Sequence, residues 1–586
     1  MTDAKLPPLH TGKSDFLVIR GDKCLYVDKT PHLRGLLAVR SASAAGHIPS
    51  LEHKYQFLAR PRRFGKSLLI NTLEAWFQGV PPNHELADAS EAATWPGAPA
   101  GWNRPRWLWE GLDAEGWHGL HGWHPVIRLS LPLPTSLDAG EIRIGLTTHL
   151  RNVGLEWEDR GVPWGTAPCR PLPGLDVDPR DWLVFLIREL HRHYGVRPVV
   201  LVDEYDAPLV EFIGTDVDPA PVLRLLRGLY GVLKSSEADL YGVFLTGISR
   251  FSQVNLFSAL NNLQDLSEMD ACGALCGFTE EEVARHFGSF LRHIQKLVPG
   301  FRGRDVIAEL SHFYNGYRFS PEPEAPSIFN PYALLMCMQS LHSESARRHA
   351  ARGQWPTHWS TSGSPDFLVR LVRQGRIRLP SEVDGNSYQA GSSYRIDHPD
   401  YVAVMLQTGY YTLRGGGDEP LRVEYPNLEV RRTYGKELLE AYVPGGGTVP
   451  VERLRDALRT EDQEAWCRQL ETLFHGIPYD NLSNEGAYRA VMHVLCQLMA
   501  SFSLSESHSW GGRADHVAFI DDQVFVFEVK LNSSVETARV QLRAKGYARP
   551  YMERDREVTA IYLNFKRGRD SEDPPHIECE FERLHP

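Results

Sequence analysis

The segment that most constrains the fold spans residues 57–69, because its parts stand in the order that a phosphate-binding loop requires. A short apolar run predicts a strand over 55–58, the tripeptide Gly-Lys-Ser follows at 65–67, and an apolar pattern predicts a helix over 68–77. In such loops backbone N–H groups bind phosphate oxygens, the lysine reaches the β- and γ-phosphates, and the serine hydroxyl ligates Mg²⁺. The segment therefore predicts a site for ATP and Mg²⁺ formed by Arg63, Phe64, Gly65, Lys66, Ser67 and Leu68.

The loop differs from the common pattern G-x-x-x-x-G-K-[ST] at its first glycine, where this chain has Arg60. The same tripeptide also occurs at residues 12–14, with no predicted strand before it and no predicted helix after it. We interpret that copy as a coincidence, which shows that the tripeptide alone carries little weight. A second element is needed to support a nucleotide site.

That second element is a strand predicted over residues 198–203, which ends in Asp203 and Glu204. In ATPases with a phosphate-binding loop, an aspartate at this position holds Mg²⁺ and a glutamate polarises the water that attacks the γ-phosphate. A buried parallel strand followed by an acidic turn would have the same pattern without any nucleotide. Strand-like and helix-like segments lie between the two elements, as a doubly wound sheet requires, and they favour nucleoside triphosphate binding. We therefore predict Ser67 and Asp203 as metal ligands and Glu204 as a catalytic residue.

A third strand, predicted over residues 240–245, leads to Arg250. In an open α/β sheet, ligands bind at the carboxyl ends of the parallel strands. Polar groups that follow one strand can therefore contact a ligand bound at the neighbouring strands. Arg250 is therefore a candidate contact to the γ-phosphate, and the pattern fits a surface arginine that caps a loop equally well.

Length and composition bound the remaining possibilities. A chain of 586 residues is too long for one hydrophobic core and predicts about three or four domains. The net charge of −11 gives no general attraction to nucleic acid, so any such surface must be local. The N-terminus has no apolar signal region, and no apolar run reaches the roughly 18 residues of a membrane span. The eight cysteines include no arrangement that completes a zinc site, so we interpret all of them as reduced thiols of a cytoplasmic protein with no membrane partner.

A second chemical cluster is predicted near the C-terminus, where two strands joined by a tight connection lie within residues 513–530. Side chains alternate along a strand, so Glu528 and Lys530 share one face, and Asp515 on the partner strand can lie beside them. Two carboxylates and the Val529 carbonyl suit Mg²⁺, and a neighbouring lysine can orient or deprotonate the attacking water. The Glu-Val-Lys run alone is more often an ion-pair pattern on an edge strand.

Six short blocks stand in order between about residues 14 and 340. They are 26–30 (YVDKT), 57–67 (FLARPRRFGKS), 202–206 (VDEYD), 245–251 (LTGISRF), 276–279 (CGFT) and 314–319 (YNGYRF). Together these blocks resemble the bacterial AAA-ATPase-like family. In that family Arg-Pro-Arg-Arg-Phe-Gly-Lys-Ser is the usual form of the loop, so the resemblance implies that the missing glycine is a family trait.

Many members of that family carry a C-terminal nuclease of the PD-(D/E)XK superfamily, and the C-terminal cluster resembles the core of such a nuclease. The resemblance implies catalytic roles for Asp515, Glu528 and Lys530, with Asp515 and Glu528 as metal ligands. It adds Glu485, which opens a predicted helix, as a further acid, and Gln541 on the helix that follows the strands.

These patterns and resemblances predict an α/β protein. A P-loop NTPase domain with a parallel sheet core is expected over residues 1–270, and a helical lid or middle region over 271–380. A linker and helical connector is expected over 381–470, and a mixed α/β, restriction-endonuclease-like PD-(D/E)XK domain over 471–586.

Two groups of arginines are candidates for contact with a phosphate backbone. Over residues 344–378, seven arginines face only two acids, although a charge run of this kind is more often a solvated face. Arg539 and Arg543 stand four residues apart on a predicted helix and share one of its faces.

The sequence therefore predicts ATP-gated, Mg²⁺-dependent cleavage of nucleic acid, with DNA as the expected substrate. The family resemblance suggests a role in defence against foreign DNA, and a homo-oligomer remains open. One alternative is an ATP-switched sensor that binds nucleic acid without cutting it. A second is a small-molecule kinase, which would leave the C-terminal acids without a role.

Overall fold

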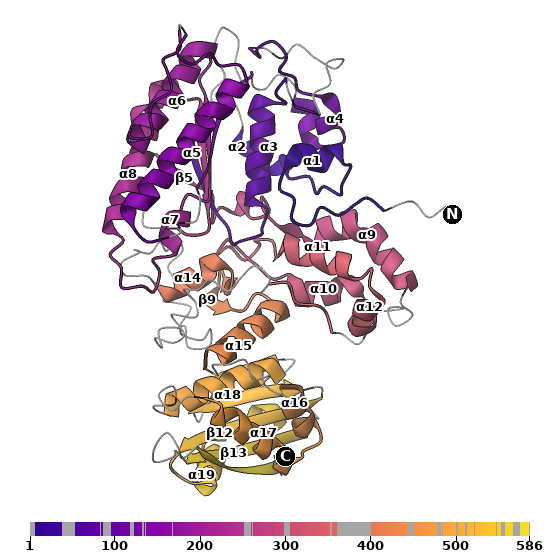
Figure 1. Ribbon diagram of the computed structural model, residues 1–586. Coiled ribbons are helices and arrows are strands. Elements are labelled where there is room, and N and C mark those ends of the chain that lie inside the picture. Colours follow the sequence, from indigo (N-terminus) through magenta and orange to yellow (C-terminus); the bar gives the residue numbers. More distant parts are fainter. Residues whose placement is uncertain are drawn as a thin grey trace. The chain divides into compact units, whose positions relative to one another are not determined.

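The computed structural model of the chain is shown in Figure 1. It describes residues 6–37, 53–82, 84–85, 95, 97–117, 122–131, 134, 136–166, 168–250, 260, 262–297, 305–351, 354–359, 400–442, 451–477, 482, 485–499, 502–509, 512–520, 522–546, 548–552, 557–566 and 575–584. The chain forms two compact units. The first contains residues 1–362 and 385–427, and the second contains residues 363–384 and 428–586.

The first unit is built around a parallel sheet of five strands in the order β2-β3-β4-β1-β5. β1 (Tyr55–Ala59), β3 (Val199–Asp203) and β4 (Gly242–Gly247) are buried along their whole length, as expected of strands covered by helices on both faces. β2 (Val126–Ser130) and β5 (Gln264–Asp265) form the two edges. β4 lies between β1 and β3, so the strands that precede the two predicted nucleotide elements end at the same edge of the sheet. The predicted parallel α/β core is confirmed.

Helices cover both faces of this sheet. α3 (Lys66–Gln78) packs against β2 and β3 on one face. α5 (Ala139–Asp159), α6 (Pro179–Tyr194) and α8 (Ala220–Ser235) pack against one another, and Figure 1 shows them on the other side of the sheet. The side chains of Asp138 and Asp178 accept hydrogen bonds from backbone N–H groups and fix the starts of α5 and α6.

Two short helices, α1 (Phe16–Gly21) and α2 (Thr30–Leu36), precede β1. Between α3 and β2 the described chain is mostly irregular, apart from α4 (Arg106–Trp109) and the 3-10 turn η2 (Asp113–Trp117). Short elements also follow the later strands: α7 (Ala207–Val210), η3 (Glu237–Asp239) and η4 (Asp270–Cys272).

The middle region of the first unit is mainly helical. It contains α9 (Glu280–Leu297), α10 (Val306–Tyr314), α11 (Pro331–Ser340) and α12 (Glu344–Ala351). α10 ends at Tyr314, because the backbone of Asn315 is extended. Gly316 follows with a φ of +99°, and a side chain there would meet the Pro426 carbonyl. The unit also contains α14 (Tyr401–Thr408) and two small antiparallel pairs, β6 (Phe278–Thr279) with β7 (Ile328–Phe329) and β8 (Thr412–Gly416) with β9 (Glu419–Glu424).

The second unit is a mixed sheet of five strands in the order β10-β11-β12-β13-β14. The strands are β10 (Phe502–Ser509), β11 (Gly512–Ile520), β12 (Gln523–Leu531), β13 (Glu557–Lys566) and β14 (His576–Leu584). β12 and β13 pair in parallel, and the other neighbours are antiparallel. The hairpin expected over 513–530 is β11 and β12. β10 was not expected, because its serine-rich sequence lacks a clear apolar alternation.

The helices of the second unit pack on both faces of its sheet. They are α15 (Leu428–Tyr442), α16 (Val451–Arg459), α17 (Gln463–His475), α18 (Glu485–Met499), α19 (Val535–Lys545) and α20 (Arg549–Met552). Val524 and Val526 of β12 pack with Leu542 of α19, whereas Phe527 contacts Trp466 of α17. Even-numbered residues of β12 therefore face α19, and odd-numbered residues face α17.

The structure joins Cys467 of α17 to Cys579 of β14 in a disulfide, so the prediction that all cysteines are reduced thiols is wrong for this pair. The two residues are 112 positions apart, and the sequence contains no local spacing that would reveal their contact. Over the described ranges, no helix combines the length and the apolar character that crossing a membrane requires.

Five of the seven arginines that the sequence groups within residues 344–378 lie outside the described residues. They are Arg352, Arg370, Arg373, Arg376 and Arg378. The other two, Arg347 and Arg348, lie on α12, where the Arg347 guanidinium donates hydrogen bonds to the carbonyls of Leu341 and His342.

Candidate nucleotide site and candidate metal centre

The Gly-Lys-Ser loop connects the carboxyl end of β1 to the N-terminus of α3. Gly65 caps the helix with a left-handed backbone, at a φ of +95°, and no atom lies within 4 Å of the place where a side chain would begin. Arg63 also has a positive φ of 65°, so the loop is sharply curved around the start of the helix. The first N–H groups of α3 point out of such a curve, which is the arrangement that binds phosphate oxygens.

Lys66 lies at the first position of α3 and is almost completely buried, with 6% of its surface exposed. Its Nζ donates hydrogen bonds to the carbonyls of Arg60 and Pro61, each at 2.9 Å. Burial lowers the pKa of Lys66, and the nearby carboxylates of Asp203 and Asp206 act in the opposite direction. The Lys66 ammonium is thus held by two carbonyls of its own loop. A bound phosphate would replace these carbonyls as the acceptor of the Lys66 hydrogen bonds.

The acids that follow β3 lie at the same edge of the sheet as the Gly-Lys-Ser loop. Asp203 is 4% exposed, and its Oδ1 accepts a hydrogen bond from the Thr246 hydroxyl of β4 at 2.8 Å. Glu204 has a positive φ of 53° and is exposed, so its carboxylate is available to solvent or ligand. Asp206 is buried and accepts hydrogen bonds from the backbone N–H groups of Ile248 and Ser249, which fixes the chain after β4.

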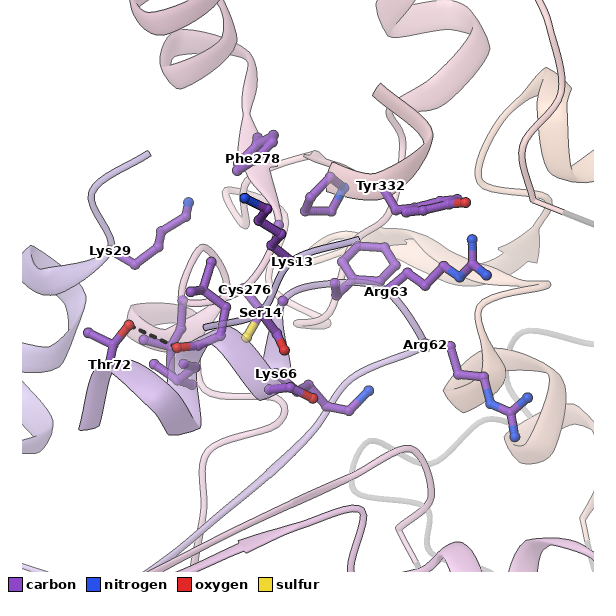
Figure 2. A pocket seen from close by; sticks show the side chains of 18 of the residues that line it. Lys13, Ser14, Lys29, Arg62, Arg63, Lys66, Thr72, Cys276, Phe278 and Tyr332 are labelled. Atoms are coloured by element: carbon purple, nitrogen blue, oxygen red, sulfur yellow. Dashed lines mark hydrogen bonds between the residues drawn. The ribbon is translucent and has the colours of Figure 1, made fainter. Parts of the chain in front are cut away.

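A cavity of about 650 Å³ lies against this loop. Its walls include Lys66, Ser67 and Glu204, and Figure 2 shows Arg62, Arg63 and Lys66 around it. Its volume is in the range of small-molecule sites, which run from about 300 to 1,000 Å³. The residues fit a nucleotide, because the curved loop, the N-terminus of α3, Lys66, Glu204 and Asp206 all line one space; Asp203 does not line it.

The copy of Gly-Lys-Ser at residues 12–14 also lines this cavity. The expectation that no helix follows it is wrong, since α1 begins at Phe16 with Asp15 as its N-cap. That copy has no preceding strand among the described elements, and Lys13 forms an ion pair with Asp22 at 2.7 Å. It contributes to the wall of the cavity without forming a phosphate-binding loop.

Arg60, which replaces the first glycine of the common pattern, is a structural residue in this fold. Its guanidinium is buried and donates hydrogen bonds to the carbonyls of Ala59 (2.8 Å), Ser267 (2.7 Å) and Cys272 (2.9 Å). It also lies over the ring of Phe319, with 4.3 Å from Cζ to the ring centre. Arg60 thereby ties the loop to the segment that follows β5.

Restoring the common pattern with Arg60→Gly is expected to destabilise the protein by about 3 kcal/mol, because it leaves buried carbonyl groups without a donor. Thermal or urea unfolding measures the loss. Arg62→Gly, at a half-exposed position in the same loop, is the matched control and should cost less than about 1 kcal/mol. Equal stability of Arg60→Gly and wild type would contradict the structural role.

Arg250 does not line the cavity described above. Its guanidinium forms ion pairs with Asp265 of β5 (2.7 Å) and with Glu268. Its backbone N–H donates to the Gln407 side chain at 2.6 Å. Two acids therefore neutralise the charge of Arg250 in this conformation. The sequence had made Arg250 a candidate contact to the γ-phosphate.

The candidate metal centre lies at the β11–β12 pair of the second unit. The antiparallel register pairs His516 with Phe527, which sets Asp515 opposite Glu528 on the α19 face. Asp515 is 6% exposed and its Oδ2 accepts a hydrogen bond from the Val529 N–H at 2.7 Å. Lys530 Nζ donates to Glu528 Oε1 at 2.8 Å and to the Val529 carbonyl at 3.1 Å. Asp515, Glu528 and Lys530 therefore converge as the alternation predicts.

The donor set of this centre fits a hard cation. Glu528 is fully buried, and its Oε2 has no hydrogen-bond partner among the described residues. Burial, together with the neighbouring carboxylate of Asp515, raises the pKa of Glu528 to about 7. A buried oxygen without a partner beside a second carboxylate is a place where a cation or a proton is stabilised. No larger cluster of three His, Cys, Asp or Glu side chains is found in the described part of the chain.

The pKa of Glu528 predicts how metal affinity depends on pH. Below pH 7 the carboxyl holds a proton that a cation must displace, so the apparent affinity for Mg²⁺ should fall by up to about tenfold per pH unit. Above pH 8 it should be nearly constant. Calorimetric titration at pH 6, 7, 8 and 9 measures this, and Glu528→Gln should bind more weakly with little pH dependence. An affinity that is flat between pH 6 and 7 in the wild type would contradict the assignment.

Two other predicted residues of this centre lie on the flanking helices. Glu485 is the first residue of α18, which packs against β11, and its side chain lies outside the described part. Gln541 is half-buried on α19. The predicted phosphate-binding arginines of α19 are engaged by acids: Arg539 with Glu536, Glu580 and Glu582, and Arg543 with Glu582.

The sequence did not single out Arg489, which lies one turn after Glu485 on α18. Its guanidinium forms an ion pair with Asp515, with Nε 3.2 Å from Oδ1. The signal that could have revealed it is the four-residue spacing from Glu485, which places both residues on one helix face. Arg489 and Lys530 thus balance the two carboxylates of the centre.

The chain matches two family models. Residues 10–87 and 104–257 match the model described as a predicted AAA-ATPase (AAA-ATPase-like), and residues 483–571 match a model of the PD-(D/E)XK nuclease superfamily. The chain is also 30% identical over 590 residues, or 97% of each chain, to a protein of Azotobacter chroococcum mcd 1 described as an uncharacterized protein in the vnfD 5' region. No solved structure matches the chain significantly.

Proposed function

The chain belongs to the predicted AAA-ATPase-like family and carries a C-terminal domain of the PD-(D/E)XK nuclease superfamily, and from this premise we propose that it hydrolyses ATP and cleaves DNA. We assign the nucleotide function to residues 1–270 and the cleavage to residues 471–586. Residues 271–380 would form a helical lid, and residues 381–470 a connector between the two functions.

The first activity follows from the groups around the cavity. The N–H groups at the start of α3 would bind the phosphates, and Lys66 would leave the carbonyls of Arg60 and Pro61 to bind the β- and γ-phosphates. Ser67 and Asp203 would hold Mg²⁺, which when bound neutralises phosphate charge. Glu204, exposed at the edge of the cavity, would orient and polarise the attacking water.

The second activity follows from the convergence of Asp515, Glu528 and Lys530 on the α19 face of the sheet. Asp515, Glu528 and the Val529 carbonyl would hold Mg²⁺, which when bound stabilises the charge that develops on the scissile phosphate. Lys530 would orient the attacking water or take its proton, and Glu485 and Gln541 would complete the catalytic set. The single observation that carries this proposal is the unpartnered, fully buried Oε2 of Glu528 beside a second carboxylate.

We further propose that ATP gates the cleavage, that the protein acts in the cytoplasm, and that it defends the cell against foreign DNA. The chain has a net charge of −11, which disfavours indiscriminate attraction to DNA. A specific DNA structure or a partner, including a second copy of the chain, would then provide the trigger.

The test is cleavage of supercoiled plasmid, linear duplex and single-stranded DNA by the full chain, with and without Mg²⁺ and ATP. We expect Mg²⁺-dependent products whose yield changes with ATP. ATP hydrolysis without cleavage of any substrate, under any divalent metal, would contradict the nuclease proposal. The ion pairs of Arg489 with Asp515 and Lys530 with Glu528 favour the remaining candidate in that case, an ATP-switched sensor that binds nucleic acid without cutting it.

A further inference from the structure

The cavity beside the Gly-Lys-Ser loop continues well beyond the loop itself. One additional wall comes from the chain before β1, with His10, Val27 and Leu33, and another from the chain after β5, with Leu275 and Phe278. Figure 2 shows Lys13, Lys29 and Phe278 in a part of the cavity away from Lys66. A triphosphate at the N-terminus of α3 would leave this part of the cavity for the rest of the nucleotide.

Many of the residues that line the cavity outside the Gly-Lys-Ser loop are apolar. The side chains of Val27, Leu33, Leu275, Phe278 and Leu335 are all buried in the fold and contribute to the cavity. Apolar walls with a few fixed polar groups suit the flat faces of a nucleoside base, whereas phosphate groups require donors and positive charge. We call the part of the cavity lined by Val27, Leu33 and Phe278 its apolar end.

The polar groups at the apolar end already have partners. Lys13 pairs with Asp22, Lys29 pairs with Glu282 at 2.5 Å, and the Tyr26 phenol hydrogen-bonds with Thr72.

His10 differs from these residues. It is 7% exposed, lines the cavity, and its Nδ1 has no hydrogen-bond partner among the described residues, while backbone groups of Lys13 and Leu25 also act on its imidazole. A buried ring nitrogen without a partner costs free energy that a ligand atom can recover.

We propose that the base of the bound nucleotide occupies the apolar end of the cavity and forms a hydrogen bond with Nδ1 of His10. The inference rests on the proposed nucleotide function and adds a residue that recognises the base. Burial lowers the pKa of His10, so its imidazole is neutral at pH 7 and offers one donor and one acceptor nitrogen. The backbone is held in place for this role, because Lys13 N–H donates to the His10 carbonyl and Leu25 N–H donates to the Pro8 carbonyl.

The test compares ATP with inorganic tripolyphosphate, which has the phosphates without the nucleoside. For His10→Ala we expect about tenfold weaker binding of ATP by calorimetry and unchanged binding of tripolyphosphate. His10→Gln, which keeps a hydrogen-bonding side chain, should recover part of the loss. His342→Ala, at an exposed position, is the matched control and should bind both ligands as the wild type does.

The outcomes separate this inference from the proposed function. If the wild type binds both ligands and His10→Ala weakens both equally or neither, the base does not contact His10 and the inference fails alone. If the wild type binds neither ligand, the proposed nucleotide function fails and the inference fails with it.

A second experiment does not depend on the folding of a variant. Photolabelling of the wild-type chain with 8-azidoadenosine triphosphate, followed by mass spectrometry, should place the label in residues 8–33 or 275–335. Unlabelled ATP should suppress this labelling. ATP-protected labelling confined to other segments would overturn the inference.

Discussion

Asp515→Asn is expected to reduce metal-dependent cleavage of DNA by about a thousandfold or more, while ATP hydrolysis stays at the wild-type rate. Asp515 is buried opposite Glu528, and its two oxygens contact the Val529 N–H and the Arg489 guanidinium. The amide keeps the size and much of the hydrogen bonding of the carboxylate but removes the negative charge that a cation needs. The loss should therefore concern metal binding and catalysis, with a small change in stability.

The matched control for this variant is Asp522→Asn. Asp522 is exposed in the connection between β11 and β12, so the same chemical change occurs a few residues from the centre without reaching it. Cleavage by Asp522→Asn should remain within about twofold of the wild type, as for most exposed positions. Calorimetry with Mg²⁺ gives a readout besides activity, because Asp515→Asn should lose most of its affinity. Full cleavage by Asp515→Asn would remove this centre from the proposed mechanism.

Lys66→Ala is expected to abolish detectable ATP hydrolysis and to weaken ATP binding by at least about a hundredfold. In the structure Lys66 Nζ is held between the carbonyls of Arg60 and Pro61 at the floor of the cavity. A phosphate that replaces these carbonyls gains a charge-assisted contact, and alanine cannot provide it. If ATP gates cleavage, this variant should also lose the effect of ATP on DNA products.

Lys296→Ala on α9 provides the control for Lys66→Ala, since Lys296 is an exposed lysine of the same unit. It should hydrolyse ATP at the wild-type rate. Thermal unfolding of both variants separates loss of ligand binding from loss of fold, because Lys66→Ala leaves two carbonyls without their donor. ATP turnover by a folded Lys66→Ala protein at the wild-type rate would contradict the assignment of the phosphate-binding loop.

Local patterns predicted the parts of the fold that depend on neighbouring residues. The strand, loop and helix around Lys66 follow from apolar runs and a glycine, and the structure has β1, a loop and α3 there. The shared face of Glu528 and Lys530 follows from the two-residue period of a strand, and their side chains hydrogen-bond in the structure. In both cases the information lies within about a dozen residues.

Contacts between distant segments could not be predicted in this way. The distant partners of Arg60 are the backbone carbonyls of Ser267 and Cys272. Every residue has such a carbonyl, so the residue type does not reveal which one accepts a hydrogen bond. Arg250 follows a predicted strand, but its pairing with Asp265 depends on β5, which has only two residues. His10 precedes every predicted element, and the sequence contained no sign that its ring would be buried beside the loop.

The bonds of Arg60 also have a consequence for how the chain is made on the ribosome. Its two distant acceptors lie 207 and 212 residues further along the sequence. At a synthesis rate of about 5 to 20 residues per second, the loop emerges about 10 to 40 s before the residues that hold it. During that interval the nascent chain cannot complete the nucleotide cavity, so ATP can assist folding only after the segment around Cys272 has been synthesised.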